Sequence, residues 1–229
     1  MVWDFLERLG VVPGGYVTFN LALDLKDERI PVLTVKSSAS SVNVEYAREK
    51  VIRVSGKRRR RGMARISLLE ENKKLIALVE CDSASLTVKG PFRGFTTVAD
   101  TSGVALNSSQ VLEYVGVKAD TSGVKIDTPL NKDGYIYLKL DTSSAKLTIK
   151  PVEVGEYKIE VNADTSSIKL DIESGFPVYY ILDTKKLDAS SFNVKNIEEL
   201  AGTSLDDAVI LRLKLKLDTS SFKLSKKAS

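Results

Sequence analysis

The sequence predicts an all-β repeat fold, and three observations support that prediction. A short polar unit of the type D-T-S-S or D-T-S-G recurs along the chain, apolar and polar residues alternate on both sides of each unit, and the longest apolar runs have the length of a strand. Alternation with a period of two is typical of half-buried strands. Self-similarity at a roughly constant interval indicates a stacked array of structural units.

The N-terminal segment is expected to cap this array. Val2–Gly10 can form a short amphipathic helix with Trp3 and Leu6 near one face, and the breaker VVPGG follows it. The open end of a repeat stack exposes apolar core and unpaired strand edges, which a terminal helix can cover. We therefore expect an N-terminal capping helix and breaker in residues 1–15 and a single repeat domain in residues 16–229.

Eight copies of the polar unit follow the cap. The aspartates of successive copies lie between 18 and 30 residues apart, and a wider interval before Asp82 predicts a degenerate copy near Gly62–Leu68. The eight copies are Ser37–Val44, Cys81–Val88, Ala99–Leu106, Ala119–Ile126, Leu140–Leu147, Ala163–Leu170, Leu187–Val194 and Leu217–Leu224.

Each copy is expected to form a corner between two strands. Residues one, three and five before the aspartate are apolar, as in Leu217, Leu215 and Leu213. Turn-forming Asp, Ser and Thr side chains accept hydrogen bonds from nearby backbone N–H groups, and Gly103 and Gly123 suggest a positive φ at the fourth position of the corner. Continued alternation turns the threonines inward, where they could stack, and the aspartates outward. The predicted corner residues are Asp82, Asp100, Asp120, Asp141, Asp164, Asp188, Asp218, Thr101, Thr121, Thr142, Thr165 and Thr219.

Two architectures satisfy this alternation. In a β-solenoid each unit is one coil and equivalent residues stack in columns about 4.8 Å apart, whereas in an antiparallel β-meander each corner is a hairpin loop. We expect a single-stranded β-solenoid (β-helix) of about eight or nine coils, because the corner is chemically uniform while the other connections vary. The antiparallel β-meander is the alternative.

The unit ADTSGVKI, Ala119–Ile126, resembles the T-S-S-G-D-V-type repeats of the putative-adhesin β-solenoid family of bacteria and archaea. The resemblance extends from about Val35 to Leu224, although this chain has no Gly-Asp pair after the serine. It implies a β-solenoid fold and an adhesin-like structural role.

The residues favour a non-enzymatic structural or interaction protein with no cofactor and no metal. Aspartic proteases need two special carboxylates on D-T/S-G loops, whereas Asp120 belongs to a repeated architectural corner, so we predict no catalytic residue. The absence of histidine removes the commonest general base and metal ligand. A polysaccharide-acting β-helix enzyme is a further alternative, with Asp171, Asp183, Lys185 and Lys186 as its candidate residues.

Several features bear on partners. The cluster Lys57, Arg58, Arg59, Arg60 and Arg61 is predicted to be either a solvated hairpin tip or a contact for an anionic partner such as nucleic acid, acidic polysaccharide or anionic lipid. The amphipathic C-terminal strand is expected to be an open edge through which copies self-associate as a homo-oligomer.

Other expectations concern environment and local structure. The sequence has neither a signal peptide nor a membrane-spanning segment, which favours a cytoplasmic location, and the lack of histidine beside many Lys and Glu residues is typical of a thermophile. Cys81 is expected to be a buried free thiol. Residues 196–208 are expected to form a helical turn on the side of the stack.

Overall fold

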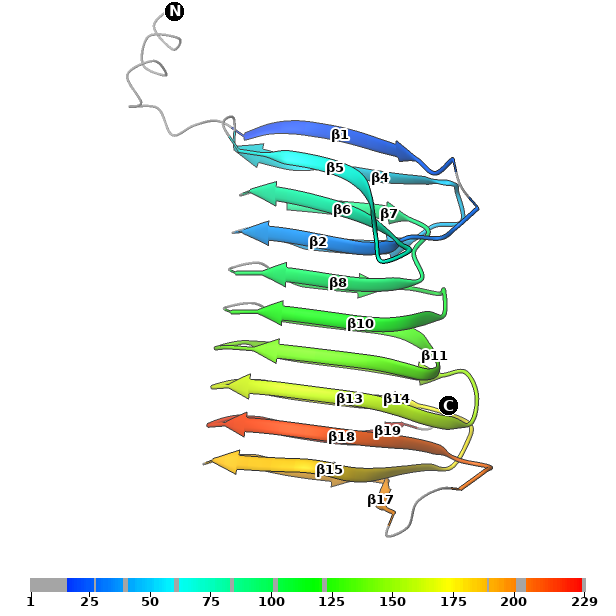
Figure 1. Cartoon of the computed structure of the whole chain (residues 1–229). Coiled ribbons are helices and arrows are strands. Elements are labelled where there is room, and N and C mark those ends of the chain that lie inside the picture. The colour runs from blue at the N-terminus through cyan, green and yellow to red at the C-terminus, as the bar shows by residue number, and fades with distance from the viewer. Residues whose placement is uncertain are drawn as a thin grey trace, which may run out of the picture.

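The computed structural model describes residues 16–26, 28–38, 41–59, 62–82, 85–100, 103–120, 123–188, 190–200 and 205–227. Within these ranges the protein is all-β, with nineteen strands and no helix, and the strands join into one hydrogen-bonded sheet. The sheet folds over into two faces that enclose the core, and the strands form an elongated stack (Figure 1). The expected capping helix in residues 1–15 lies outside the described residues.

The first face contains the strands that precede the corners and, at its two ends, two further strands that precede no corner. In their order along the stack they are β5 (Ala64–Glu71), β6 (Lys74–Asp82), β2 (Val32–Ser38), β8 (Gly94–Ala99), β10 (Leu112–Ala119), the second half of β11 (Gly123–Leu140), β13 (Gly155–Asp164), β18 (Val209–Asp218) and β15 (Val178–Asp188), which also pairs with the short β17 (Glu198–Glu199).

The second face contains the strands that follow the corners and, at one end, two further strands that follow no corner. Its order along the stack is β1 (Tyr16–Asp24), β4 (Val51–Arg59), β7 (Ser85–Gly90), β3 (Val42–Tyr46), β9 (Val104–Asn107), the first half of β11, β12 (Ser144–Pro151), β14 (Ser167–Glu173), β19 (Ser221–Lys227) and β16 (Ser191–Lys195).

The core between the two faces is built from the predicted apolar positions. Leu213, Leu215 and Leu217 of β18 are all buried, as are the apolar residues at the same positions of the other units except the one that ends at Asp188, where Leu187 is half-buried. Cys81 is a buried free thiol, as predicted, and burial raises its pKa. Alternation therefore identified the inward residues of the units other than β15–β16 correctly.

The units that neighbour one another in the stack and carry the corners pair in parallel and in register. On the first face Leu140 aligns with Ala163, which in turn aligns with Leu217, so residues that directly precede equivalent aspartates lie side by side. On the second face Leu147 aligns with Leu170, which aligns with Leu224. Because the strands lie one above another (Figure 1), this register places equivalent residues in columns along the stack.

The units do not stack in the order of the sequence, which corrects the expectation of consecutive solenoid coils. The unit β6–β7 lies outside the unit β2–β3, because β2 pairs with both β6 and β8. The final unit, β18–β19, lies between β13–β14 and β15–β16. The meander alternative fits in part, since β1 with β4, β4 with β7 and β5 with β6 pair antiparallel.

The predicted C-terminal edge is wrong for the same reason. Strand β18 pairs with β13 on one side and β15 on the other, and β19 is likewise paired on both sides. Arg212 of β18 links the two neighbours, because its guanidinium donates to Glu156 of β13 at 2.7 and 3.0 Å and to Asp183 of β15 at 3.1 Å. This hydrogen-bonded contact with Arg212 lowers the pKa of Glu156. Oppositely charged neighbours therefore accompany the insertion of the last unit.

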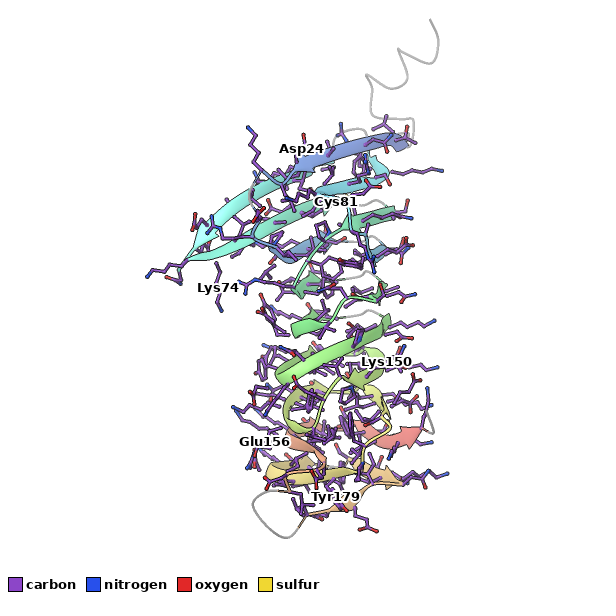
Figure 2. All side chains as sticks on the ribbon, turned by 90° about the vertical axis from the view of Figure 1, so that its right-hand side faces the viewer. Asp24, Lys74, Cys81, Lys150, Glu156 and Tyr179 are labelled. Atoms are coloured by element: carbon purple, nitrogen blue, oxygen red, sulfur yellow. The ribbon has the colours of Figure 1, made fainter. Side chains whose placement is uncertain are left out.

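The segment near Gly62–Leu68 does not form the expected degenerate copy. Strands β5 and β6 form a hairpin in which Asn72 and Lys73 both have positive φ values, 49° and 64°, as a tight two-residue turn requires. Lys74 lies at the end of this hairpin, which projects from the side of the stack (Figure 2). The helical turn expected in residues 196–208 is also wrong for its described part, where β17 pairs with β15.

Candidate functional site

Each fully described D-T-S-S corner is held by its third residue, a serine. The side chains of Ser143, Ser166 and Ser220 are buried, at 6%, 5% and 4% exposure. The backbone N–H of Ser143 donates to Oγ of Ser166 at 3.3 Å, and that of Ser166 donates to Oγ of Ser220 at 3.0 Å. The N–H of Ser220 donates to Oγ of Ser190 at 2.9 Å. We call Ser143, Ser166, Ser220 and Ser190 the serine column.

The hydroxyl groups of the column also donate to backbone carbonyls at the corners. Ser166 donates to the carbonyl oxygen of Asp164 at 2.8 Å, and Ser220 donates to that of Asp218 at 2.8 Å. Ser166 and Ser220 therefore each accept a hydrogen bond from the backbone of a neighbouring unit and close their own turn with the hydroxyl. The hydroxyl of Ser143 instead donates to carbonyl oxygens of the neighbouring unit, those of Ala119 at 3.1 Å and Asp120 at 2.8 Å. Buried polar groups are costly when unpaired, so this double use explains why the third position recurs as serine.

The threonines lie outside the column, which contradicts their expected inward orientation. Thr142, Thr165 and Thr219 are exposed. The aspartate and the threonine are two successive outward residues because the chain bends between them, so the inward position passes to the serine. Thr165 and Thr219 both have φ near 48°, a region that β-branched residues rarely occupy.

The expected positive φ at the fourth corner position is wrong as well. In the described part of the chain, the residues with positive φ include the two threonines but neither Gly103 nor Gly123. Thr101 and Thr121 lie outside the described residues, so their predicted orientation stays a prediction.

The aspartates face outward, as predicted. Asp82 is half-buried, and the remaining six are exposed. The backbone N–H of Thr142 donates to Oδ1 of Asp141 at 3.2 Å, and the hydroxyl of Thr165 donates to Oδ1 of Asp164 at 3.3 Å. At these corners the carboxylate thus accepts a hydrogen bond from the threonine, and the serine hydroxyl donates to a backbone carbonyl. The exposed aspartates are Asp100, Asp120, Asp141, Asp164, Asp188 and Asp218.

Two grooves flank the line of corners. One is lined by serine, threonine and glycine of the corners. The other lies on the first face, where a row of lysines two positions before the aspartates alternates with them. Opposite charges therefore neighbour one another along this second groove, whose lysines are Lys118, Lys139, Lys186 and Lys216.

A different row of lysines lies on the second face. Lys125 aligns with Lys146, Lys146 with Lys169, and Lys169 with Lys223, on the adjacent strands β11, β12, β14 and β19. We call these four residues the lysine row. Unit charges at the spacing of adjacent strands repel one another by about 1 kcal/mol in water. The row is therefore a concentrated strip of positive charge.

Asp171 of β14 is the buried charged group beside this row. Its side chain is 0% exposed, and it meets the ammonium groups of Lys169 at 3.1 Å and Lys227 at 3.0 Å. The hydroxyl of Ser225 donates to it at 2.6 Å. Burial acts to raise the pKa of Asp171, but these three partners outweigh burial, and the pKa lies below its ordinary value. Asp171 is thus a structural ion-pair centre.

The candidates for an enzyme site are not brought together. Asp171 lies on the second face, whereas Asp183 lies on β15 of the first face and pairs with Arg212. Lys186 lies 3.7 Å from the neighbouring corner carboxylate of Asp188. These distributed pairs leave no joint cluster of the candidate residues whose side chains the structure describes.

The basic cluster is placed only in part. Lys57, Arg58 and Arg59 belong to β4, which pairs with β1 and, at Lys57, with β7. They therefore lie in a strand, which corrects the expected hairpin tip, and Arg58 donates to the carbonyl of Gly62. Arg60 and Arg61 lie outside the described residues. An anion-binding role for Lys57–Arg61 stays a prediction.

Two searches of the described residues gave negative results. They contain no group of three or more His, Cys, Asp or Glu side chains that could hold a metal ion. Among the same residues, no helix is long and apolar enough to cross a membrane.

These features define an all-β protein of stacked repeat units joined by hydrogen-bonded corners. No family model and no curated protein sequence matches the chain. Solved structures resemble it at very low sequence identity. A putative cell adhesion protein from Clostridium sporogenes has a TM-score of 0.44 and 6% identity, with 93% of this chain and 100% of that chain covered.

Two structures from Parabacteroides distasonis are also similar. A putative adhesin has a TM-score of 0.33 and 8% identity, with 94% of this chain and 98% of that chain covered. A putative lipid binding protein has a TM-score of 0.26 and 10% identity, with the same coverage, 94% and 98%.

Proposed function

We propose that the protein is a non-enzymatic interaction protein, built as a rigid scaffold of stacked β-strand units that presents repeated rows of side chains. The observation that supports this most directly is the serine column, because it ties neighbouring corners to one another through buried hydrogen bonds. Such bonds resist sliding of one unit against the next. The polar residues of the repeat thus serve architecture, and the exposed rows remain for recognition.

Rigidity also follows from the continuous core. Each inner strand is paired on both sides, and apolar residues of both faces meet along the length of the stack. Adjacent strands lie about 4.8 Å apart, so every outward position recurs at that interval along a straight line. A partner with its own linear repeat can match such a surface.

Electron microscopy of the purified protein tests the scaffold. We expect single particles of one elongated shape, with the width of a two-layer sheet. Small-angle X-ray scattering in solution should give the same elongation. Spherical particles, or a broad range of shapes for the isolated chain, would contradict a rigid scaffold.

The scaffold proposal includes end-to-end association through β16 rather than through the C-terminal strand. In the described part of the chain β16 pairs with β19 alone. Its half-buried Phe192 stacks on Phe222 with a centroid distance of 5.8 Å, which continues the core to the end of the stack. A second copy could pair with this edge, as edge strands commonly do.

Sedimentation velocity over a range of concentrations tests this association. The wild-type chain should form larger species as the concentration rises, and Val194→Lys should stay monomeric because it places a charge in the paired edge. A wild-type chain that stays monomeric at all concentrations would refute the association. The rigid scaffold is tested separately, by electron microscopy.

A further inference from the structure

The lysine row places four cations on four adjacent strands of the second face. Lys125, Lys146 and Lys223 are exposed, and Lys169 is half-buried. No ion pair joins the three exposed lysines to an acidic side chain of the described residues, whereas Lys169 meets Asp171. The four side chains occupy one straight line of equivalent positions across four adjacent strands.

The acidic groups near the row are already engaged. Asp127 lies 2.6 Å from Lys150, which also lies 3.8 Å from Glu173. Asp171 is held by Lys169 and Lys227. On the corner side of the row, the neighbouring outward residues are serines and a glycine, which carry no charge. Asp171 therefore neutralises Lys169 in part, whereas the charges of Lys125, Lys146 and Lys223 have no ion-pair partner among the described residues.

The other lysines of the repeat make the contrast clear. Lys118, Lys139 and Lys216 also align along the stack, but they line a groove together with the corner aspartates. The two rows occupy equivalent positions on adjacent strands, but Asn162 stands in the first-face row where the second face has Lys169. They also differ in the charge beside them, because the corner aspartates lie next to the first-face lysines. Of these two rows, the lysine row of the second face is the unbroken line of cations.

We propose that the lysine row binds a linear acidic polysaccharide that lies along the stack, with one carboxylate or sulfate group of successive sugars near successive lysines. The row repeats at the strand spacing of about 4.8 Å, and one sugar ring of an extended chain is of similar length. The neighbouring Ser144, Ser167 and Ser221 are exposed hydroxyls suited to sugar hydroxyl groups. A shallow groove continues the strip toward β16, with Lys195 on its wall.

The surface favours this partner over other polyanions. No aromatic side chain lies at the outward positions between these lysines on β12, β14 and β19, so bases of a nucleic acid would have nothing to stack on. The outward residues of the row and of its serine neighbours are not apolar, so a bilayer would gain no insertion. The inference rests on the proposed interaction role and names its partner class.

Binding to polygalacturonate, measured by isothermal titration calorimetry, tests the inference. We expect affinity that falls steeply with salt and is lost for the fully methyl-esterified polymer, which has the same backbone without charge. Replacing Lys125, Lys146 and Lys223 together by glutamine should weaken binding about tenfold. The matched control replaces Lys118, Lys139 and Lys216 by glutamine, removes the same net charge, and should change affinity less than twofold.

The outcomes separate the possible explanations. Equal losses in the two triple variants would overturn the inference, since binding would then follow net charge alone. Tighter binding of a single-stranded oligonucleotide or of phosphatidylserine vesicles, with the same dependence on the lysine row, would also overturn it. A variant with arginine at the three positions should keep its affinity and its melting temperature, which guards against misfolding. Failure to bind leaves the particle shape, and hence the scaffold, as an independent test.

Discussion

Replacing Ser166 by alanine removes the central member of the serine column. The backbone N–H of Ser143 loses its acceptor at 3.3 Å, and the carbonyl of Asp164 loses a donor at 2.8 Å. Ser166 is 5% exposed, so water cannot readily replace the hydroxyl. A buried polar group without a partner costs about 1–3 kcal/mol, and we expect a loss of about 2–3 kcal/mol in the free energy of unfolding.

Urea denaturation followed by circular dichroism measures this loss, and thermal unfolding should show a melting temperature lower by roughly 5–10 °C for a chain of this size. Ser190→Ala at the end of the column should cost less, because Ser190 is half-buried and water can reach the N–H of Ser220. Ser144→Ala, at the next and exposed position of a corner, should change stability by less than about 0.5 kcal/mol.

The comparison of Ser166→Ala with Ser144→Ala decides the argument. If both substitutions cost the same, the buried hydrogen bonds of the column contribute nothing specific, and the explanation of the recurring serine fails. A large loss of unfolding free energy for Ser166→Ala, a smaller loss for Ser190→Ala and almost none for Ser144→Ala would support the explanation.

Three further substitutions test other parts of the structure. Asp171→Asn should lower the unfolding free energy by about 1–2 kcal/mol at neutral pH. Because the pKa of Asp171 is depressed in the folded state, its stabilising contribution is complete above the ordinary carboxyl pKa of about 4 and disappears as pH falls through the lower folded pKa. A stability difference between wild type and variant that stays constant down to acidic pH would refute this contribution. Gly56→Ala would place a Cβ atom 1.8 Å from a backbone carbonyl oxygen of β7, and it should lower the free energy of unfolding by about 3 kcal/mol or more. Gly123→Ala, whose Cβ would have no atom within 4 Å, should leave the free energy of unfolding nearly unchanged in the same denaturation assay. Thr165→Asn should raise the free energy of unfolding by about 1 kcal/mol, because asparagine tolerates the φ of 48° better than a β-branched residue. Thr142→Asn is the control, and it should give no gain because φ is not positive there. An equal gain at both sites would contradict the idea that the backbone of Thr165 is strained.

The strands and the inward residues could be predicted from the sequence because alternation is a local property. The apolar positions before and after most corners are buried as expected, and Cys81 is among them, whereas those around Asp188 at the end of the stack are half-buried. The outward aspartates also follow from the alternation. It failed between Asp and Thr, where the chain bends: Thr165 adopts a left-handed backbone, and Ser166 takes the inward position. The alternation of apolar and polar residues gives no sign that the inward position shifts by one residue at the bend.

The order of the units could not be predicted for a different reason. All units present nearly the same alternation, so β18 could pair equally well with any strand of the first face by that criterion. The contacts that distinguish the neighbours are specific, as in Arg212 between Glu156 and Asp183. The antiparallel region depends on Gly56, whose missing side chain admits the carbonyl of Ser85. Such pairwise contacts become visible only when both partners are placed.

The position of β18–β19 has a consequence for how the protein can be made and enlarged. Within the described residues, β16 has β19 as its strand partner, and β15 has β18 and the two-residue β17. During synthesis residues 178–195 therefore emerge before the unit β18–β19 that pairs with them, and assembly of that end must await residues 209–227. A duplicated repeat placed directly after β19 would follow an interior layer of the stack, so adding a layer at this end requires insertion at another point of the chain.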